Sequence, residues 1–124
     1  MFSLERQVYF LGYRSDIYQL LYFADLFVFP SYREGLSVSL MEAKAAGLPA
    51  VVSNIRGNED LITNGVDGFL VEPDDSISFA ERISELRTNK SLWRTMSKNT
   101  KSFIKFFSTE KINQLMKNIY DGFL

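Results

Sequence analysis

The stretch that decides the fold is Leu26-Phe27-Val28-Phe29-Pro30-Ser31-Tyr32-Arg33-Glu34-Gly35-Leu36-Ser37-Val38-Ser39-Leu40-Met41-Glu42-Ala43-Lys44-Ala45-Ala46-Gly47-Leu48-Pro49-Ala50-Val51-Val52-Ser53. The apolar runs at 26–30 and 50–53 predict strands that are buried on both faces, as in parallel sheets. The small residues over 38–46 predict a helix, which Gly47 ends in the left-handed conformation with Pro49 two positions later. The stretch therefore predicts a βαβ unit, in which ligands bind at the carboxyl ends of the strands.

The loop that follows the first strand carries residues suited to binding an anion or a sugar. Gly35 permits backbone angles and a close approach that a Cβ would prevent. The amides of the first helical turn are unpaired donors, namely those of Leu36, Ser37 and Val38. Together with the helix dipole they favour phosphate or sugar oxygens, and the carboxylates of Glu34 and Glu42 are acceptors for sugar hydroxyls.

A purely structural interpretation of the same residues is open at this point. Ser39-x-x-Glu42 also fits a capping box, in which Glu42 would close the start of the helix. Glu34 would then be an ordinary exposed carboxylate of a loop. Spacing alone does not separate this interpretation from a ligand site.

The pattern Pro30-Ser-x-x-Glu34-Gly-x6-Glu42-Ala-x-Ala-x-Gly47-x-Pro49 resembles the E-x7-E signature of retaining GT-B glycosyltransferases of family 4, also called glycosyl transferases group 1. The agreement continues upstream in Val8-Tyr-Phe-Leu-Gly12-Tyr and Leu20-Leu-Tyr22-x-Ala24-Asp25. It continues downstream in Ser53-Asn-Ile-Arg-Gly57-Asn58-Glu59-Asp60-Leu-Ile62 and Gly65-Val-Asp-Gly68-Phe-Leu-Val71. The resemblance covers about residues 7–90.

The resemblance implies an α/β fold, a partial Rossmann-like parallel sheet of about four strands with flanking helices and an α-helical C-terminus. We expect one partial donor-binding domain over 1–124, with the Rossmann-like core at 7–90 and C-terminal helices at 91–124. The implied activity is transfer of a sugar from a UDP- or GDP-linked donor to a glycan or lipid-linked acceptor, with retention, in surface polysaccharide synthesis. The mechanism needs no cofactor and no metal.

The resemblance also implies roles for individual residues. Glu34 would hold hydroxyls of the donor sugar at the catalytic position, and Glu42 would accept from the ribose hydroxyls. The remaining donor-binding residues would contact the sugar and phosphates or the nucleotide base; they are Gly35, Leu36, Ser37, Gly12, Tyr13 and Arg14. For the last three, a plain βα loop without ligand contacts explains the side chains equally well.

Two departures from the family pattern matter. Asp60 stands where a Glu is usual. The sequence also lacks the N-terminal acceptor domain, the first strands of the donor domain and the Arg/Lys pair that binds the diphosphate in family members. We therefore expect this chain alone to be inactive as a transferase, and the alternative is a truncated fragment that acts only as a weak nucleotide-binding or assembly module.

Composition excludes several other classes of protein. His and Cys are absent, which removes Ser-His-Asp, Cys-His and zinc hydrolase chemistry as well as disulfides. The net charge of −1 gives no indication of nucleic-acid binding. No apolar run reaches the ~20 residues that a membrane-spanning helix needs, and the first residues do not resemble a signal peptide. We expect a cytoplasmic location, with peripheral contact at the inner membrane face.

Periodicity predicts the remaining elements. These are a strand at 8–11, a helix from Ser15 or Asp16 carrying Ile17, Leu20, Leu21 and Ala24, a short helix capped by Asn54 or Asn58 and ending near 64–65, and a strand at 69–71. A helix that Pro73, Asp74 and Asp75 open should bury Ile77, Ala80, Ile83 and Leu86. A helix at about 91–107 should place Leu92, Trp93, Met96, Thr100, Phe103 and Phe107 on one side.

The helices after residue 90 suggest two kinds of partner. The basic residues of the 91–107 helix form a stripe that either rests on an anionic membrane or is a solvated face; they are Lys90, Arg94, Lys98, Lys101 and Lys105. The last helix, from Ser108 or Thr109 to about Asp121, carries an amphipathic stripe. That stripe and an unpaired sheet edge predict self-association into homo-oligomers.

Overall fold

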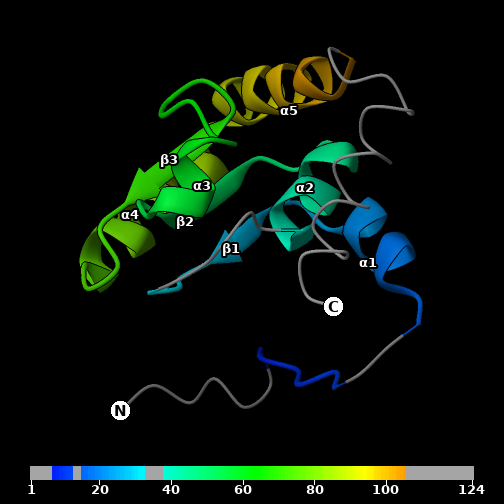
Figure 1. Ribbon diagram of the computed structural model, residues 1–124, viewed down its shortest axis with the longest axis horizontal. Coiled ribbons are helices and arrows are strands. Elements are labelled where there is room, and N and C mark those ends of the chain that lie inside the picture. Colours follow the sequence, from blue (N-terminus) through cyan, green and yellow to red (C-terminus); the bar gives the residue numbers. More distant parts are fainter. Residues whose placement is uncertain (1–6, 13–14, 33–37, 106–124) are drawn as a thin grey trace.

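The computed structural model describes residues 7–12, 15–32 and 38–105 (Figure 1). Within these ranges the elements are α1 (Ile17–Phe23), β1 (Phe27–Phe29), α2 (Val38–Ala45), β2 (Ala50–Ser53), α3 (Arg56–Glu59), β3 (Gly68–Val71), α4 (Ser76–Thr88) and α5 (Lys90–Lys105). The strands are parallel in the order β1-β2-β3, with Phe27 opposite Ala50 and Ala50 opposite Gly68. The predicted α/β class is confirmed, with three strands in the described sheet where about four were expected.

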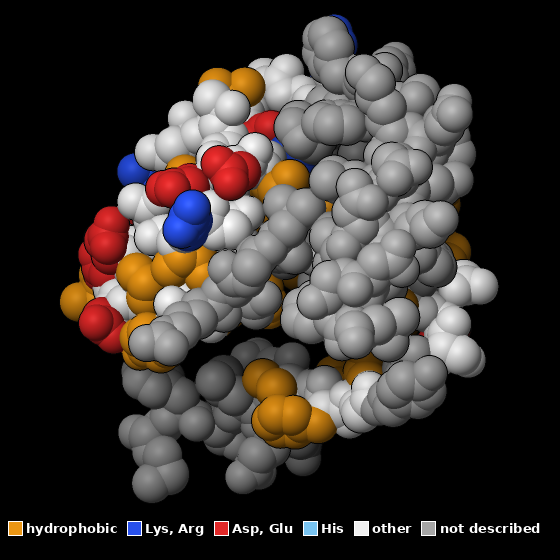
Figure 2. All heavy atoms as spheres, in the orientation of Figure 1, with side chains coloured by type: hydrophobic (Ala, Val, Ile, Leu, Met, Phe, Trp, Pro, Cys, Tyr) orange, Lys and Arg blue, Asp and Glu red, His pale blue; other side chains and the backbone are white. Residues whose placement is uncertain are grey.

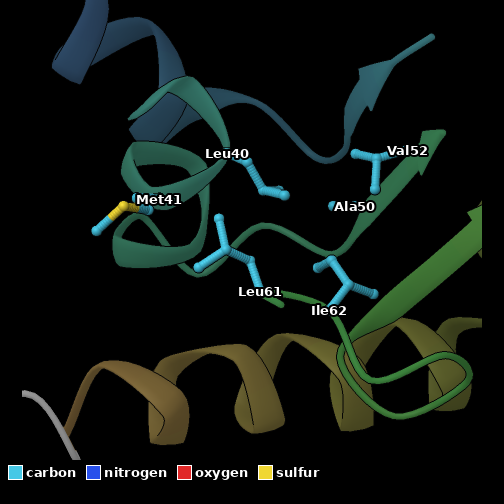
Figure 3. Packing of buried hydrophobic residues seen from close by; sticks show 6 residues of the cluster. All are labelled: Leu40, Met41, Ala50, Val52, Leu61 and Ile62. Atoms are coloured by element: carbon cyan, nitrogen blue, oxygen red, sulfur yellow. The ribbon is translucent and has the colours of Figure 1, made fainter. Parts of the chain in front are cut away.

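The central strand β2 is buried along its whole length, because helices cover both faces of the sheet. Ala50 and Val52 face a cluster formed with Leu40, Met41, Leu61 and Ile62 (Figure 3). Val51 faces the opposite cluster, which contains Phe69, Val71, Phe79, Leu86 and Met96. Alternate residues of a strand point to opposite faces, so four consecutive apolar or small residues serve two cores.

The end of α2 has the geometry of a Schellman motif. Gly47 has a φ of 80°, its N–H donates to the Lys44 carbonyl at 2.9 Å, and the Leu48 N–H donates to the Ala43 carbonyl at 3.1 Å. These bonds satisfy carbonyls that the end of a helix would otherwise leave without donors. The predicted role of Gly47 is confirmed, and the motif sets the direction in which the chain enters β2.

Helix α5 crosses the amino ends of all three strands and bonds to the chain just before each one. Trp93 Nε1 donates to the Asp25 carbonyl at 2.6 Å, ahead of β1. Ser97 Oγ donates to the Gly47 carbonyl at 2.7 Å, ahead of β2, and Asn99 Nδ2 donates to the Val66 carbonyl at 2.8 Å, ahead of β3. The amino end of the sheet is therefore closed by one helix.

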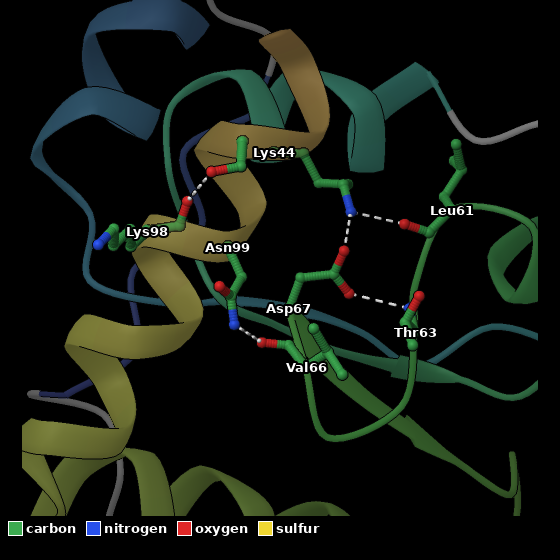
Figure 4. A network of polar contacts seen from close by, with 8 residues as sticks. Lys44, Leu61, Thr63, Val66, Asp67, Lys98 and Asn99 are labelled. Carbon is green, nitrogen blue, oxygen red and sulfur yellow. Dashed lines mark hydrogen bonds and ion pairs between the residues drawn. The ribbon is translucent and has the colours of Figure 1, made fainter. Parts of the chain in front are cut away.

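A buried ion pair joins α2 to the loop ahead of β3 (Figure 4). Lys44 is fully buried, and its Nζ donates to Asp67 Oδ2 at 2.7 Å and to the Leu61 carbonyl at 2.6 Å. Asp67 Oδ1 accepts from the Thr63 N–H at 2.9 Å. Burial lowers the pKa of Lys44, and the bond to Asp67 opposes that shift. Each charge is thus paired and hydrogen-bonded, which is the condition for tolerating charge in a protein interior.

The predicted strand at 8–11 is wrong for this structure. Residues 8–11 pair with no strand of the described sheet, and their side chains are exposed, Phe10 at 97%. Figure 1 shows this segment apart from the sheet. A strand is defined by hydrogen bonds to a neighbour, and a local run of apolar residues does not supply that neighbour.

Two further predictions about the sheet need correction. The expected burial of 26–30 on both faces is wrong, because β1 is at an edge of the described sheet and Val28 is 39% exposed. The helix after β2 is also shorter than expected, since it ends at Glu59 and its N-cap is Ile55. Asn58 lies within that helix, buried, and its Nδ2 donates to the Ser53 carbonyl at 3.0 Å.

The two helices that follow the sheet agree partly with prediction. Asp75 caps α4 by accepting from the Ser78 N–H, and Leu86 is buried and Ile83 half-buried, as expected. The expected burial of Ile77 and Ala80 is wrong, since Ile77 is 71% exposed and Ala80 is exposed, and Phe79 is buried instead. In α5, Met96 and Thr100 are buried as expected, and the side chains of Lys90, Arg94, Lys98 and Lys101 are exposed. The rest of this prediction lies outside what the structure describes, namely the side chains of Phe103 and Lys105, residue Phe107 and the helix expected at 108–121.

None of the helices within the described ranges is both long enough and apolar enough to cross a membrane.

We predict that the buried ion pair makes a large contribution to stability. Lys44→Met should lower the free energy of unfolding by about 3–5 kcal/mol, because it leaves the Asp67 carboxylate buried without its cation. Adding Asp67→Asn to Lys44→Met should recover part of the loss, since Asn keeps an acceptor for the Thr63 N–H and has no charge. Urea denaturation of the three proteins measures both effects.

Glu85→Gln is the matched control, because it breaks the exposed Arg82–Glu85 pair, whose side chains are 46% and 42% exposed. Its cost should be at most about 1 kcal/mol. A Lys44→Met cost no larger than that of the control would contradict the prediction.

Candidate functional site

The carboxyl ends of the strands lie side by side, opposite the end that α5 closes. β1, β2 and β3 end at Phe29, Ser53 and Val71, and the Asn54 N–H donates to the Val71 carbonyl at 2.7 Å. Because the strands are parallel and in register, the segments that follow them come together at the carboxyl end of the sheet. This is the end at which α/β sheets bind ligands, and it is called the carboxyl edge below.

The segment that follows β1 is attached to β2 by a hydrogen bond. The Ser31 N–H donates to Ser53 Oγ at 2.7 Å, and Ser53 is fully buried. Ser53 also accepts at its carbonyl from the buried Asn58 side chain. The bond therefore ties the described residues that follow β1 to the end of β2.

Polar side chains connect the same edge to the end of β3. Tyr32 Oη donates to Asp74 Oδ1 at 2.9 Å, and this bond raises the pKa of the Tyr32 hydroxyl. Asn54 Nδ2 donates to Glu72 Oε1 at 3.2 Å. Figure 2 shows acidic side chains gathered over the part of the molecule that holds β2, β3, α3 and α4. The edge therefore offers several carboxylate acceptors to a ligand that carries hydroxyl donors.

Glu42 is half-buried on α2, and this burial raises the pKa of its carboxyl group. Among the described residues no side chain or backbone N–H donates to its carboxylate. Ser39 lies inside α2, one residue after its first residue, so Ser39 is not the N-cap and the capping-box interpretation is wrong. A carboxylate that has lost part of its water and gained no donor can accept hydrogen bonds from a ligand at reduced cost.

The structure describes two of the eight predicted site residues. Gly12 has a φ of 64°, and no heavy atom lies within 4 Å of the position that a Cβ would take, so its place is exposed. Glu42 is described above. The other six lie outside the described residues, and their arrangement stays a prediction; they are Glu34, Gly35, Leu36, Ser37, Tyr13 and Arg14.

Several polar residues at this edge were not selected from the sequence. Ser53 ends β2 and Asn54 follows it, while Glu72 follows β3 and Asp74 comes two residues later. The strand-end rule that selected the loop after β1 applies equally to β2 and β3 and would have found them. Within the described part of the chain no three side chains of Asp, Glu, His or Cys form a group that could hold a metal ion.

We predict that Ser53 positions the loop after β1. Ser53→Ala should cost about 1–3 kcal/mol of stability, because the Ser31 N–H loses its acceptor in a partly buried place. It should also weaken the binding of a ligand that contacts the segment after β1. Thermal denaturation and calorimetric titration measure the two effects, with the exposed Ser84→Ala on α4 as control. A Ser53→Ala protein that matches the control in both measurements would show that the bond has no positioning role.

We predict that the charge of Glu42 lowers stability. A carboxyl whose pKa is raised on folding stabilises the folded state most when the pH is below its ordinary pKa near 4.5, and that contribution is lost as the pH rises through the raised value. Glu42→Gln cannot carry this charge. The free energy of unfolding of the variant, minus that of the parent, should therefore be larger at about pH 7 than at about pH 4. Urea denaturation at both pH values tests this, and a difference that is constant or decreases with pH would contradict it. Glu81→Gln, on an exposed part of α4, is the control.

Comparisons with known proteins agree with this architecture. The family model for glycosyl transferases group 1 matches residues 2–103. The chain is 38% identical over 119 residues to a UDP-Gal:alpha-D-GlcNAc-diphosphoundecaprenol alpha-1,3-galactosyltransferase of Escherichia coli, covering 95% of this chain and 30% of that protein. It is 38% identical over 114 residues to an N,N'-diacetylbacillosaminyl-diphospho-undecaprenol alpha-1,3-N-acetylgalactosaminyltransferase of Campylobacter jejuni, covering 92% of this chain and 30% of that protein.

Among solved structures, Anabaena HepE in complex with UDP matches with a TM-score of 0.83 and 30% identity, over 96% of this chain and 33% of that one. The same protein has been solved with UDP-glucose. The chain thus spans about a third of the length of the relatives that it matches. With a family match over most of its residues, the chain belongs to the glycosyl transferases group 1 family.

Proposed function

We propose that this chain is the donor-binding part of a glycosyltransferase that transfers a sugar from a nucleotide diphosphate donor, with retention, to a glycan or lipid-linked acceptor in surface polysaccharide synthesis. The observation that carries the proposal is the environment of Glu42. Its carboxylate is half-buried, its pKa is raised, and no hydrogen-bond donor among the described residues reaches it. Ribose presents two neighbouring hydroxyl donors, which suit such an acceptor.

The names of the relatives support the choice of substrates. HepE binds UDP and UDP-glucose, and the Escherichia coli and Campylobacter relatives act on sugars linked to diphosphoundecaprenol. A nucleotide bound at the carboxyl ends of the strands would lie beside α2 and the loop that Ser53 holds. UDP or GDP is therefore the proposed leaving group of the donor.

We assign the residues as follows. Glu34 would hold the hydroxyls of the donor sugar at the reacting position, and Glu42 would accept from the ribose. The amides of Gly35, Leu36 and Ser37 would bind the sugar and the diphosphate, where negative charge develops as the sugar departs. The chain near Gly12, Tyr13 and Arg14 would contact the base. Hydrogen bonds carry this chemistry, and the proposal requires no cofactor.

Catalysis requires more than donor binding. An acceptor must be held in line with the donor carbon, and the departing diphosphate must be stabilised by cations. We propose that 1–124 is one partial donor-binding domain, with its Rossmann-like core at 7–90 and its helices at 91–124, and that an acceptor domain supplies these functions. An inactive fragment with weak nucleotide affinity or an assembly role is the second candidate.

The location proposed for the enzyme is cytoplasmic and peripheral at the inner membrane face, because lipid-linked acceptors lie in a membrane.

Self-association of the chain is proposed through the free edge of β1, since among the described strands that edge has no partner.

We predict weak binding of UDP or GDP without sugar transfer by the 124-residue chain. Two ribose bonds and the helix amides should give a dissociation constant on the order of millimolar. Chemical shifts should change near Gly12 and residues 34–42, and Glu42→Ala should abolish the change. Glu81→Ala, which removes an exposed carboxylate from α4, should leave binding unchanged.

Equal loss of binding in Glu42→Ala and Glu81→Ala would contradict the assignment of Glu42. Release of UDP from UDP-glucose with formation of a glycosylated acceptor by the purified chain would contradict the requirement for an acceptor domain. Absence of any shift with both nucleotides would favour the assembly role.

A further inference from the structure

A pocket lies between α4, α5 and the turn that precedes β1, at the opposite end of the sheet from the proposed donor site. Its volume is about 540 Å³, within the range of ~300–1,000 Å³ of pockets that hold small molecules. The residues that line it are Asp25, Leu26, Ile83, Leu86, Arg87, Lys90, Trp93 and Arg94. Asp25 and Leu26 come before β1, so the pocket is at the amino end of the sheet, whereas the nucleotide site is at the carboxyl end.

The charge around this pocket is positive. The charged residues that line it are three cations and one carboxylate, namely Arg87, Lys90, Arg94 and Asp25. Within the described part of the chain none of the three cations forms an ion pair, and Glu85, the nearest acid on α4, is paired with Arg82 at 2.9 Å. From residue 86 to residue 109 the sequence has six basic residues and no acidic one, although the whole chain has a net charge of −1. The positive charge is therefore concentrated in this region.

The interior of the pocket is apolar and has one aromatic wall. Leu26 and Ile83 are half-buried, and Leu86 is buried, so their side chains offer a hydrophobic surface below the cations. Trp93 is half-buried, and its Nε1 donates to the Asp25 carbonyl at 2.6 Å, which fixes the indole ring beside the opening. Apolar surface beneath a cationic rim with a partly exposed Trp is the arrangement by which proteins contact the boundary between lipid headgroups and acyl chains.

We propose that this pocket binds an anionic phospholipid at a membrane surface. The phosphate of the headgroup lies among Arg87, Lys90 and Arg94, and the first methylene groups of the lipid contact Leu26, Ile83 and Trp93. Charge complementarity favours an anionic lipid over a neutral one, and the apolar interior favours a lipid over a free anion. The site is separate from the donor site and does not depend on the proposed sugar transfer.

The experiment uses Trp93, which is the one tryptophan in the sequence and lines the pocket. Vesicles of phosphatidylglycerol with phosphatidylcholine should shift Trp93 emission to shorter wavelength and sediment the protein, whereas phosphatidylcholine alone should do neither. Lipids brominated on the acyl chain should quench Trp93. Inorganic phosphate and glycerol phosphate, added without lipid, should leave the emission unchanged.

Two variants with the same change of charge on the same helix separate the pocket from a general attraction to the membrane. Arg94→Glu alters a residue that lines the pocket, and Lys98→Glu alters an exposed residue of α5 that does not. A basic residue near an anionic surface contributes ~1 kcal/mol, and Arg94→Glu changes the charge by two units, so it should weaken vesicle binding about thirtyfold. Lys98→Glu should weaken it less than about threefold, and circular dichroism confirms that both variants are folded.

Several outcomes would overturn the proposal. Equal weakening by Arg94→Glu and Lys98→Glu would assign the attraction to the whole basic stripe. A full emission shift with phosphate alone would assign the pocket to a free anion, and the same shift on concentrating the protein without vesicles would assign it to a second copy of the chain. UDP titration reports on the other end of the sheet, so its failure would leave these results unaffected.

Discussion

The structure depends on the burial of β2. All four of its residues are shielded from water, and their backbone groups bond to β1 on one side and β3 on the other. Since the strand faces helices both above and below, its alternate residues belong to two separate hydrophobic clusters. The requirement to cover both faces explains why α2 lies on one face and why the chain continues into α4 and α5, which cover the other.

The two ends of the sheet differ in chemistry. At the amino end, α5 donates hydrogen bonds to the segments before each strand, and the buried Lys44–Asp67 pair joins α2 to the loop ahead of β3. At the carboxyl end, Ser53 and Asn58 are buried and hydrogen-bonded, whereas Tyr32, Asp74, Asn54 and Glu72 are exposed. Hydrogen bonds thus hold both ends of the sheet, and the carboxyl end also keeps exposed polar side chains that a ligand can approach.

Features that depend on neighbouring residues could be predicted from the sequence. Gly47 ends α2 and Asp75 caps α4, because both act within a few residues of their own position. Features that depend on residues far away in the chain could not be predicted in this way. The apolar run at 8–11 did not reveal whether a partner strand is present. In α4 the spacing correctly gave Leu86 as buried, but it selected Ile77 and Ala80 and missed Phe79, because the side of the helix that meets the sheet depends on the position of the sheet. Lys44 gave no sign of burial, since its partner Asp67 is 23 residues away.

The three hydrogen bonds from α5 have a consequence for how this sequence can change in evolution. Each donor side chain bonds to a backbone carbonyl, at Asp25, Gly47 and Val66. A carbonyl is present whatever the residue, so substitutions in the segments ahead of the strands keep these acceptors as long as the path of the backbone is unchanged. These bonds require particular side chains only at the donors Trp93, Ser97 and Asn99. They place no requirement on the side chains of the residues whose carbonyls accept. Substitutions can therefore accumulate more readily at Asp25 and Val66 than at the donors on α5, whereas Gly47 is constrained separately by its φ of 80°.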